Sequence, residues 1–375
     1  MMHNKFWLKL SVSAVAILTT ASLHAETIAF LGDGISTGGA THPALVFDGE
    51  QLKKIFANEL DLRPEASYYQ LLNQEGVNIE QPADAPRRLP LSAREFHHPL
   101  TWAFQSALQR VSVQFLDTEE YSWSYMFGRK QGFLAEQILI AARNGERSGD
   151  ALRQIDRVLD ATQSVAPRHT FLFFSGQDIC SPDLEFATTP VEFARNIESA
   201  VRYFMRNAKS DRSVSDIWLV DPLGLLQIVT APGILNHQVQ AFGQTLSCRD
   251  LQAGRISARA RPMLSPDYGI EDLFLTLVNQ GPRNYCPSLF AIHEGPAELQ
   301  VRLGTLISQY RLQLEKLVKK LQGAHPSFRV HHLKASADIL LDGPDMANDC
   351  FHLNLNGQLK ITRKMLEAVQ AVQIK

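Results

Sequence analysis

Short apolar runs alternate with longer amphipathic stretches along most of this 375-residue chain. The runs have the length and composition of strands that are buried on both faces. They span residues 27–31, 111–116, 169–174, 217–220 and 328–333. Because strands that alternate with helices pair in parallel and are covered on both sides, the pattern predicts an α/β fold with a five-stranded parallel sheet.

Apolar positions recur at helical spacing between these runs. We expect helices over residues 49–60, 97–111, 130–143, 150–162, 190–207, 297–322 and 358–372. Pro190 suits the first turn of its helix, because the N–H that proline lacks would have no helical partner there. Tyr121, Trp123, Tyr125 and Phe127 stand at alternate positions, and we interpret this aromatic stripe as packing.

Two segments break the alternation. Residues 63–95 are rich in proline, glutamine and asparagine, which predicts a long surface excursion. Residues 224–296 mix glycine, proline and asparagine with scattered apolar positions, and we interpret them as an irregular insertion over the carboxyl edge of the sheet. We therefore expect residues 26–375 to form a single domain that carries this insertion.

The first 25 residues have the pattern of an export signal. Lys5 and Lys9 accompany a short apolar core at residues 10–18, and Ala25 offers a small residue for cleavage. The core is shorter than the ~20 residues that span a bilayer, which disfavours a transmembrane anchor. We expect removal of residues 1–25 and an exported protein, periplasmic or secreted, with no stable membrane span.

The charge balance disfavours a nucleic-acid partner. The formal net charge of the whole chain is −2, and removal of Lys5 and Lys9 with the signal changes it to −4. This mild acidity provides neither the basic surface that nucleic acids require nor a polybasic stripe for anionic lipid.

Three polar segments follow apolar runs and are candidates for chemistry. The first run ends at Gly32-Asp33-Gly34-Ile35-Ser36, the third at Ser175-Gly176-Gln177-Asp178, and Asp349-Cys350-Phe351-His352 follows the fifth. Functional residues of open α/β sheets gather at the carboxyl ends of the strands, so these segments should meet there. Asp349 and His352 are three residues apart, a spacing that lets one turn present a carboxylate to an imidazole. Such a pair is the base and its orienting group in acyl transfer to a serine.

Together the three segments resemble the signature blocks of SGNH (GDSL-type) esterases and lipases. Asp349-Cys350-Phe351-His352 and Ile179-Cys180 are also similar to the phospholipase B-like branch of that family. The resemblance implies a three-layer α/β/α fold with flavodoxin-like strand order and hydrolysis of acyl esters, of lipids or small molecules, without a cofactor. It makes His352 the general base and acid and Asp349 its orienting group.

The resemblance also implies the donors that stabilise an oxyanion. Gln177 stands where the family has an asparagine, so its amide is one donor, and the backbone N–H of Gly34 is another. A further family donor is a glycine after the second strand, for which Gly128 and the backbone of Ser124 are both candidates.

Glycine replaces the nucleophilic serine of the family pattern at position 34. No acyl-enzyme can form on Gly34, so we expect ester hydrolysis to be low or absent. Three interpretations remain open. Ser36 or Thr37 could act as the nucleophile, water could attack directly with His352 as its base, or the chain could be an exported pseudoenzyme that binds ligands or glycans without turnover.

The four cysteines, Cys180, Cys248, Cys286 and Cys350, suggest two disulfides in an exported chain. Sequence does not determine their connectivity. We favour Cys248 with Cys286 inside the insertion and Cys180 with Cys350 between two loops of the candidate site, with free buried thiols as the alternative.

Two other kinds of site are disfavoured. Gly32, Gly34, Gly38 and Gly39 imitate a dinucleotide-binding turn, but Pro43 arrives before a helix could extend from it. Several histidines and Asp349 are close in sequence, but no paired metal-ligand motif occurs. Adjacent residues of a strand point to opposite faces, so His331 and His332 cannot both bind one ion. We therefore expect no metal and no cofactor.

Overall fold

The computed structural model describes residues 26–39, 41, 66–76, 87–88, 119–174, 176–210, 214–241, 244–255, 264–267 and 286–374. The predicted signal at residues 1–25, the helices at 49–60 and 97–111 and the strand at 111–116 lie outside these residues. Within the described part, no helix is long and apolar enough to cross a membrane.

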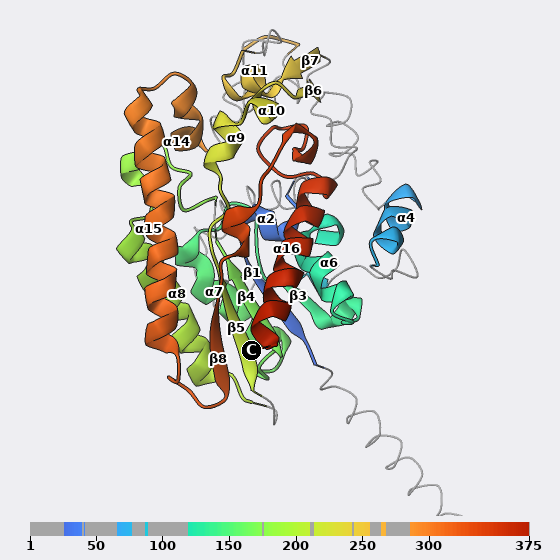
Figure 1. Ribbon diagram of the computed structural model, residues 1–375, viewed down its shortest axis with the longest axis vertical. Helices are drawn as coiled ribbons and strands as arrows, with labels where there is room; N and C mark the ends of the chain where they lie inside the picture. The colour runs from blue at the N-terminus through green and yellow to red at the C-terminus, as the bar shows by residue number, and fades with distance from the viewer. Residues whose placement is uncertain are drawn as a thin grey trace, which may run out of the picture.

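A parallel sheet forms the centre of the molecule (Figure 1). Its strands are β1 (Ile28–Gly32), β2 (Arg87–Arg88), β3 (Ile138–Ile140), β4 (His169–Phe173), β5 (Ser215–Val220) and β8 (Phe328–Leu333). Their spatial order is β2-β3-β1-β4-β5-β8, and every neighbouring pair is parallel. The five longer strands have the predicted flavodoxin-like order. The two-residue edge strand β2 is an addition that the sequence pattern did not predict.

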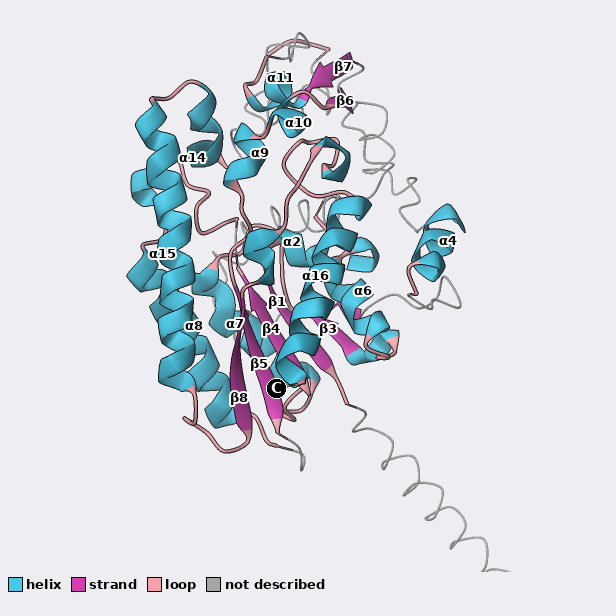
Figure 2. Ribbon diagram, in the orientation of Figure 1, coloured by secondary structure: helices cyan, strands magenta, loops and turns pink. Residues whose placement is uncertain are grey.

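Helices cover both faces of the sheet, which confirms the three-layer α/β/α architecture (Figure 2). One layer contains α7 (Ala151–Ala161), α8 (Pro190–Asn207) and α15 (Ala297–Leu321). The other contains α6 (Trp123–Lys130) and α16 (Leu355–Gln373), which pack against each other. The strands β1, β4 and β5 are buried along their whole length, as expected for strands between two helical layers.

Aromatic side chains fill the interface between the sheet and α6. Phe30 of β1 stacks on Phe171 of β4, and Phe171 stacks on Trp218 of β5. Trp123 and Phe127 of α6 meet these rings edge to face. The aromatic stripe at 121–127 is therefore packing, as predicted. The alternate spacing does not reflect a strand, because the segment is helical.

The helix predicted over residues 130–143 is wrong. The helix of this region, α6, begins at Trp123, where the Ser122 side chain caps it, and it ends before Gly132, which has φ +85°. A buried three-residue strand, β3, follows at Ile138–Ile140. Such a short apolar run carries no periodicity of its own, and only pairing with β1 makes it a strand.

The described parts of the segment from residue 224 to residue 296 lie beyond the carboxyl ends of the strands (Figure 1). Its described parts are α9 (Leu226–Thr230), α10 (Pro232–Leu235), the antiparallel hairpin β6 (Gln238–Ala241) and β7 (Gln244–Ser247), α11 (Cys248–Gln252) and α14 (Pro287–Phe290). The predicted excursion at 63–95 contains α4 (Ala66–Gln74) as well as β2.

Candidate active site

The turn after β1 is the first part of the candidate site. Asp33 caps the short helix α2 (Gly34–Thr37), since its Oδ1 accepts a hydrogen bond from the N–H of Ile35 at 3.1 Å. Its Oδ2 accepts another from the N–H of Gly176 at 2.7 Å. Asp33 therefore joins the turn after β1 to the loop after β4, and it fixes two of the three predicted segments relative to each other.

Asp349 and His352 form a buried hydrogen-bonded pair. The Asp349 Oδ2 atom lies 2.5 Å from His352 Nδ1, and Oδ1 accepts hydrogen bonds from the N–H groups of Phe351 and His352 at 3.0 and 2.9 Å. Burial by itself would raise the pKa of Asp349, but the charge and hydrogen bond of His352 and the two N–H groups outweigh it. The pKa of Asp349 is therefore lowered, and the carboxylate stays ionised beside the ring.

The imidazole of His352 packs against two glycines. An ideal Cβ on Gly34 would lie 3.2 Å from His352 Nε2, and one on Gly39 would lie 3.0 Å from Cδ2. Asp349 holds Nδ1 on the other side of the ring. The structure thus brings together the turn after β1 and the loop after β8, with Nε2 facing position 34.

A small cavity of about 20 Å³ lies at this junction. Its polar lining comes from Asp33, Asn144, Gln177 and His352 together with Gly34 and Gly176, and its apolar lining comes from Ile35, Leu223, Leu225, Ile228, Phe351 and Leu353. This volume is about what a single water molecule needs. Gln177 thus lines the same cavity as Gly34 and His352, and the insertion contributes Leu225 and Ile228 to the wall.

Asn144 is a residue of the site that sequence reasoning missed. It follows β3 and lines the cavity beside Gly34 and His352. The Asn144-Gly145 pair is typical of a turn, and a turn after an apolar run indicates the end of a strand. The apolar spacing over residues 130–143 predicts a helix there, and this hides the end of β3.

Two predicted residues lie elsewhere. Ser36 is fully buried, and its Oγ points back toward β1, 2.7 Å from where a Cβ on Gly32 would be. Gly128 is inside α6 and packs against Ile138, so it does not line the cavity. The structure therefore brings neither a hydroxyl from Ser36 nor the N–H of Gly128 to His352.

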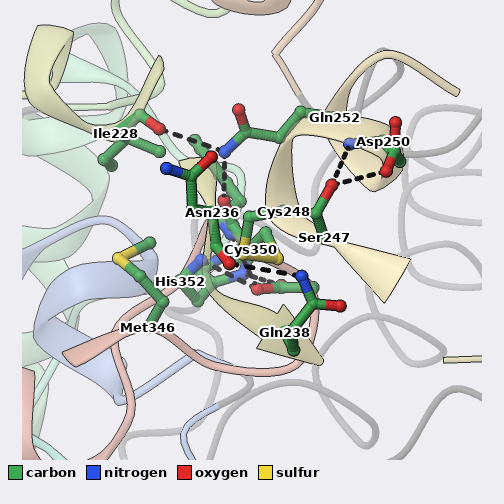
Figure 3. Close-up of a disulfide and its surroundings, with 12 residues drawn as sticks. Ile228, Asn236, Gln238, Ser247, Cys248, Asp250, Gln252, Met346, Cys350 and His352 are labelled. Carbon is green, nitrogen blue, oxygen red and sulfur yellow. Dashed lines mark hydrogen bonds and ion pairs between the residues drawn. A yellow bond between two sulfur atoms is a disulfide. The ribbon is translucent and has the colours of Figure 1, made fainter. Parts of the chain in front are cut away.

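All four cysteines form disulfides, but the pairing that we favoured is wrong. Cys180 is bonded to Cys286, and Cys248 is bonded to Cys350. Each bond thus joins the insertion to a loop of the site. Figure 3 shows the bond between Cys248 of the insertion and Cys350. Two disulfides fit an exported protein.

The Cys248–Cys350 bond fixes the loop that carries the Asp349–His352 pair. Cys350 stands between the two residues and has φ +55°, a conformation rare for a residue with a side chain. Its carbonyl also accepts a hydrogen bond from the buried Gln252 Nε2 at 2.8 Å, and the same amide donates to the carbonyl of Ile228 (Figure 3). The insertion therefore supports the geometry of the pair.

A buried network supports the other side of the site. The N–H and carbonyl of Gly32 bond to the Gln154 amide at 2.7 and 2.8 Å, and that amide also donates to Glu146. Glu146 pairs with Arg157, whose Nη1 reaches the carbonyl of Ala141 at 2.9 Å. This network joins the turn after β1 to the loop that carries Asn144.

Asp178, directly after Gln177, is a buried carboxylate. It accepts hydrogen bonds from the N–H and Oγ of Ser148 at 2.9 and 2.6 Å. Burial raises the pKa of Asp178 from 3.8 to about 6, since these hydrogen bonds only partly offset the loss of water.

This pKa predicts a pH dependence of stability. Below pH 3.8 Asp178 is protonated in both states, and between pH 3.8 and about 6 only the folded state holds the proton. The free energy of unfolding should therefore fall by about 3 kcal/mol from this residue as the pH rises through that window. Denaturant titrations of the protein and of Asp178→Asn at pH 4 and pH 7 measure it. An equal pH dependence of the two proteins would contradict the prediction.

His331 and His332 point to opposite faces of β8, as predicted. His331 Nε2 lies 2.7 Å from Asp216 Oδ1, and His332 Nε2 lies 2.6 Å from Asp221 Oδ1. Among the described residues, no group of three or more His, Cys, Asp or Glu side chains is arranged to hold a metal ion. Both histidines are thus partly buried hydrogen-bonding partners of aspartates.

No protein-family model matches the chain, and no curated protein matches its sequence.

Proposed function

We propose that this protein has the site of a serine ester hydrolase of the SGNH type whose nucleophile position holds glycine, so that hydrolysis of acyl esters is low or absent. The observation that carries the proposal is the position of His352. Its Nδ1 is held by the Asp349 carboxylate at 2.5 Å, and its Nε2 lies 3.2 Å from the position that a Cβ on Gly34 would take.

The proposed chemistry follows from what each group can do. The hydroxyl of a serine at position 34 would attack the ester carbonyl while His352 Nε2 takes its proton, and Asp349 would stabilise the imidazolium that forms. The Gln177 amide and the N–H of Gly34 would donate to the oxyanion. The protonated His352 would then protonate the leaving alcohol, and water would release the acyl group from the serine. With glycine at position 34 the first bond cannot form.

The Gly34→Ser variant tests the proposal. We expect it to hydrolyse p-nitrophenyl acetate at least ~10²-fold faster than the native chain, since a positioned base alone contributes about 10²–10⁴-fold. A fluorophosphonate should form a covalent adduct at position 34 of this variant and of no other. Gly34→Ala is the matched control, because it adds the Cβ without the hydroxyl, and it should stay at the native rate.

Two outcomes would contradict the proposal. If the native chain hydrolyses esters as fast as Gly34→Ser, the residue at position 34 is not the nucleophile. If Gly34→Ser remains folded and gains neither activity nor the adduct, even when the Asn144 amide that crowds position 34 is also removed, the site is not that of a serine hydrolase.

A non-catalytic role is the second candidate function. It is favoured by the absence of a hydroxyl at position 34, while the acid–base pair and the apolar wall of the cavity remain in place. Calorimetric titration of the native chain with a short acyl ester would support this role if heat of binding is observed without release of alcohol.

A further inference from the structure

The side chain of Asn144 fills the space that a nucleophile would need. An ideal Cβ on Gly34 would lie 2.6 Å from Asn144 Oδ1 and 3.2 Å from its Cγ. Real Cβ atoms do not approach an oxygen as closely as 2.6 Å. A serine at position 34 therefore cannot enter this site unless the amide of Asn144 moves.

The backbone of Asn144 is held in place. The N–H groups of Ala141 and Ala142 both donate to the carbonyl of Phe30, at 2.9 and 3.1 Å. Two residues beyond Asn144, the buried Glu146 is paired with Arg157 and bonded to the Gln154 amide. The loop is thus fixed to β1 on one side and to α7 on the other, so relief must come from rotation of the side chain alone.

The surroundings leave the Asn144 side chain little room to rotate. Asn144 is 9% exposed, and the cavity beside it has a volume of only about 20 Å³. The His352 ring closes the opposite side of the same space.

We infer that Gly34 and Asn144 are a complementary pair, and that Asn144 is the residue that limits what the site can hold at position 34. This inference rests on the proposed function. The amide closes the space over Gly34, so the native site excludes the tetrahedral centre of an acyl group. Removal of the amide opens that space for a serine and for a small acyl group such as acetyl.

Four variants test the inference: Asn144→Ala, Gly34→Ser, the double variant of both, and Gly34→Ser with Asn196→Ala. Asn196 is the matched control, because its amide bonds to Ser148 at 3.2 Å at the end of the same loop but does not line the cavity. We expect the double variant Gly34→Ser/Asn144→Ala to exceed Gly34→Ser by about 10- to 100-fold in kcat/KM for p-nitrophenyl acetate and in the rate of fluorophosphonate labelling. Asn144→Ala alone and the Asn196→Ala control should bring no gain.

Thermal unfolding of the same variants provides a readout that does not depend on activity. Gly34→Ser should lower the Tm by several degrees, because it overpacks a buried site, and Asn144→Ala should restore much of that loss. Equal rates of the double variant and Gly34→Ser, or a slower double variant, would overturn the inference. If no variant reacts with the ester or the phosphonate, the proposed function fails, and the coupling of the two Tm shifts still decides whether Asn144 obstructs position 34.

Discussion

Asp349→Asn, introduced into Gly34→Ser, is expected to return kcat for p-nitrophenyl acetate to near the rate of the native chain, a loss of at least ~10²-fold. The carboxylate lies 2.5 Å from His352 Nδ1, where it fixes the orientation of the ring and stabilises the imidazolium that forms during attack. An asparagine keeps the shape, and its oxygen can still accept the N–H groups of Phe351 and His352. It removes the charge that stabilises the imidazolium, so kcat falls. KM should change little, because the shape of the site is kept. Steady-state kinetics with separate kcat and KM values measure this.

Asp345→Asn is the matched control for that variant. Asp345 lies in the same segment, is 2% exposed and pairs with Lys360, but it does not touch the imidazole. It should lower stability while kcat remains within a few-fold. A value of kcat for Asp349→Asn within tenfold of its parent would show that the carboxylate does not orient the base.

Arg157→Met is expected to lower the free energy of unfolding by about 3–5 kcal/mol, the largest loss of stability that we predict. Both partners of the Arg157–Glu146 ion pair are buried, with side-chain exposures of 0% and 4%. Removal of the guanidinium would leave the Glu146 carboxylate buried without its cation. Chemical denaturation of the native chain and the variant measures the loss.

Two further variants test whether the loss of stability comes from leaving the buried Glu146 carboxylate without its cation. The double variant Glu146→Gln/Arg157→Met should recover much of the loss, because no unpaired charge remains in the interior. Arg202→Met removes a partner of Glu198 on the surface of α8 and should cost less than about 1 kcal/mol. If Arg157→Met costs no more than Arg202→Met, the buried pair does not support the turn at Gly32 in the way we describe.

Several features of this protein followed from the sequence alone. The fold class and four of the five strands could be predicted, because buried parallel strands are short continuous apolar runs between amphipathic helices. The strand order came from the resemblance of three short segments. The contact between Asp349 and His352 is local, since only the two residues of one turn lie between them.

Only the tertiary structure decided the remaining features, because they depend on contacts between residues far apart in the chain. The three-residue strand β3 exists through its pairing with β1, and Asn144 reaches Gly34 through that pairing. The disulfide partners Cys248 and Cys350 are 102 residues apart, and their pairing follows from how the insertion packs on the loop of His352. Local patterns specify elements, whereas the packing of those elements determines which side chains meet.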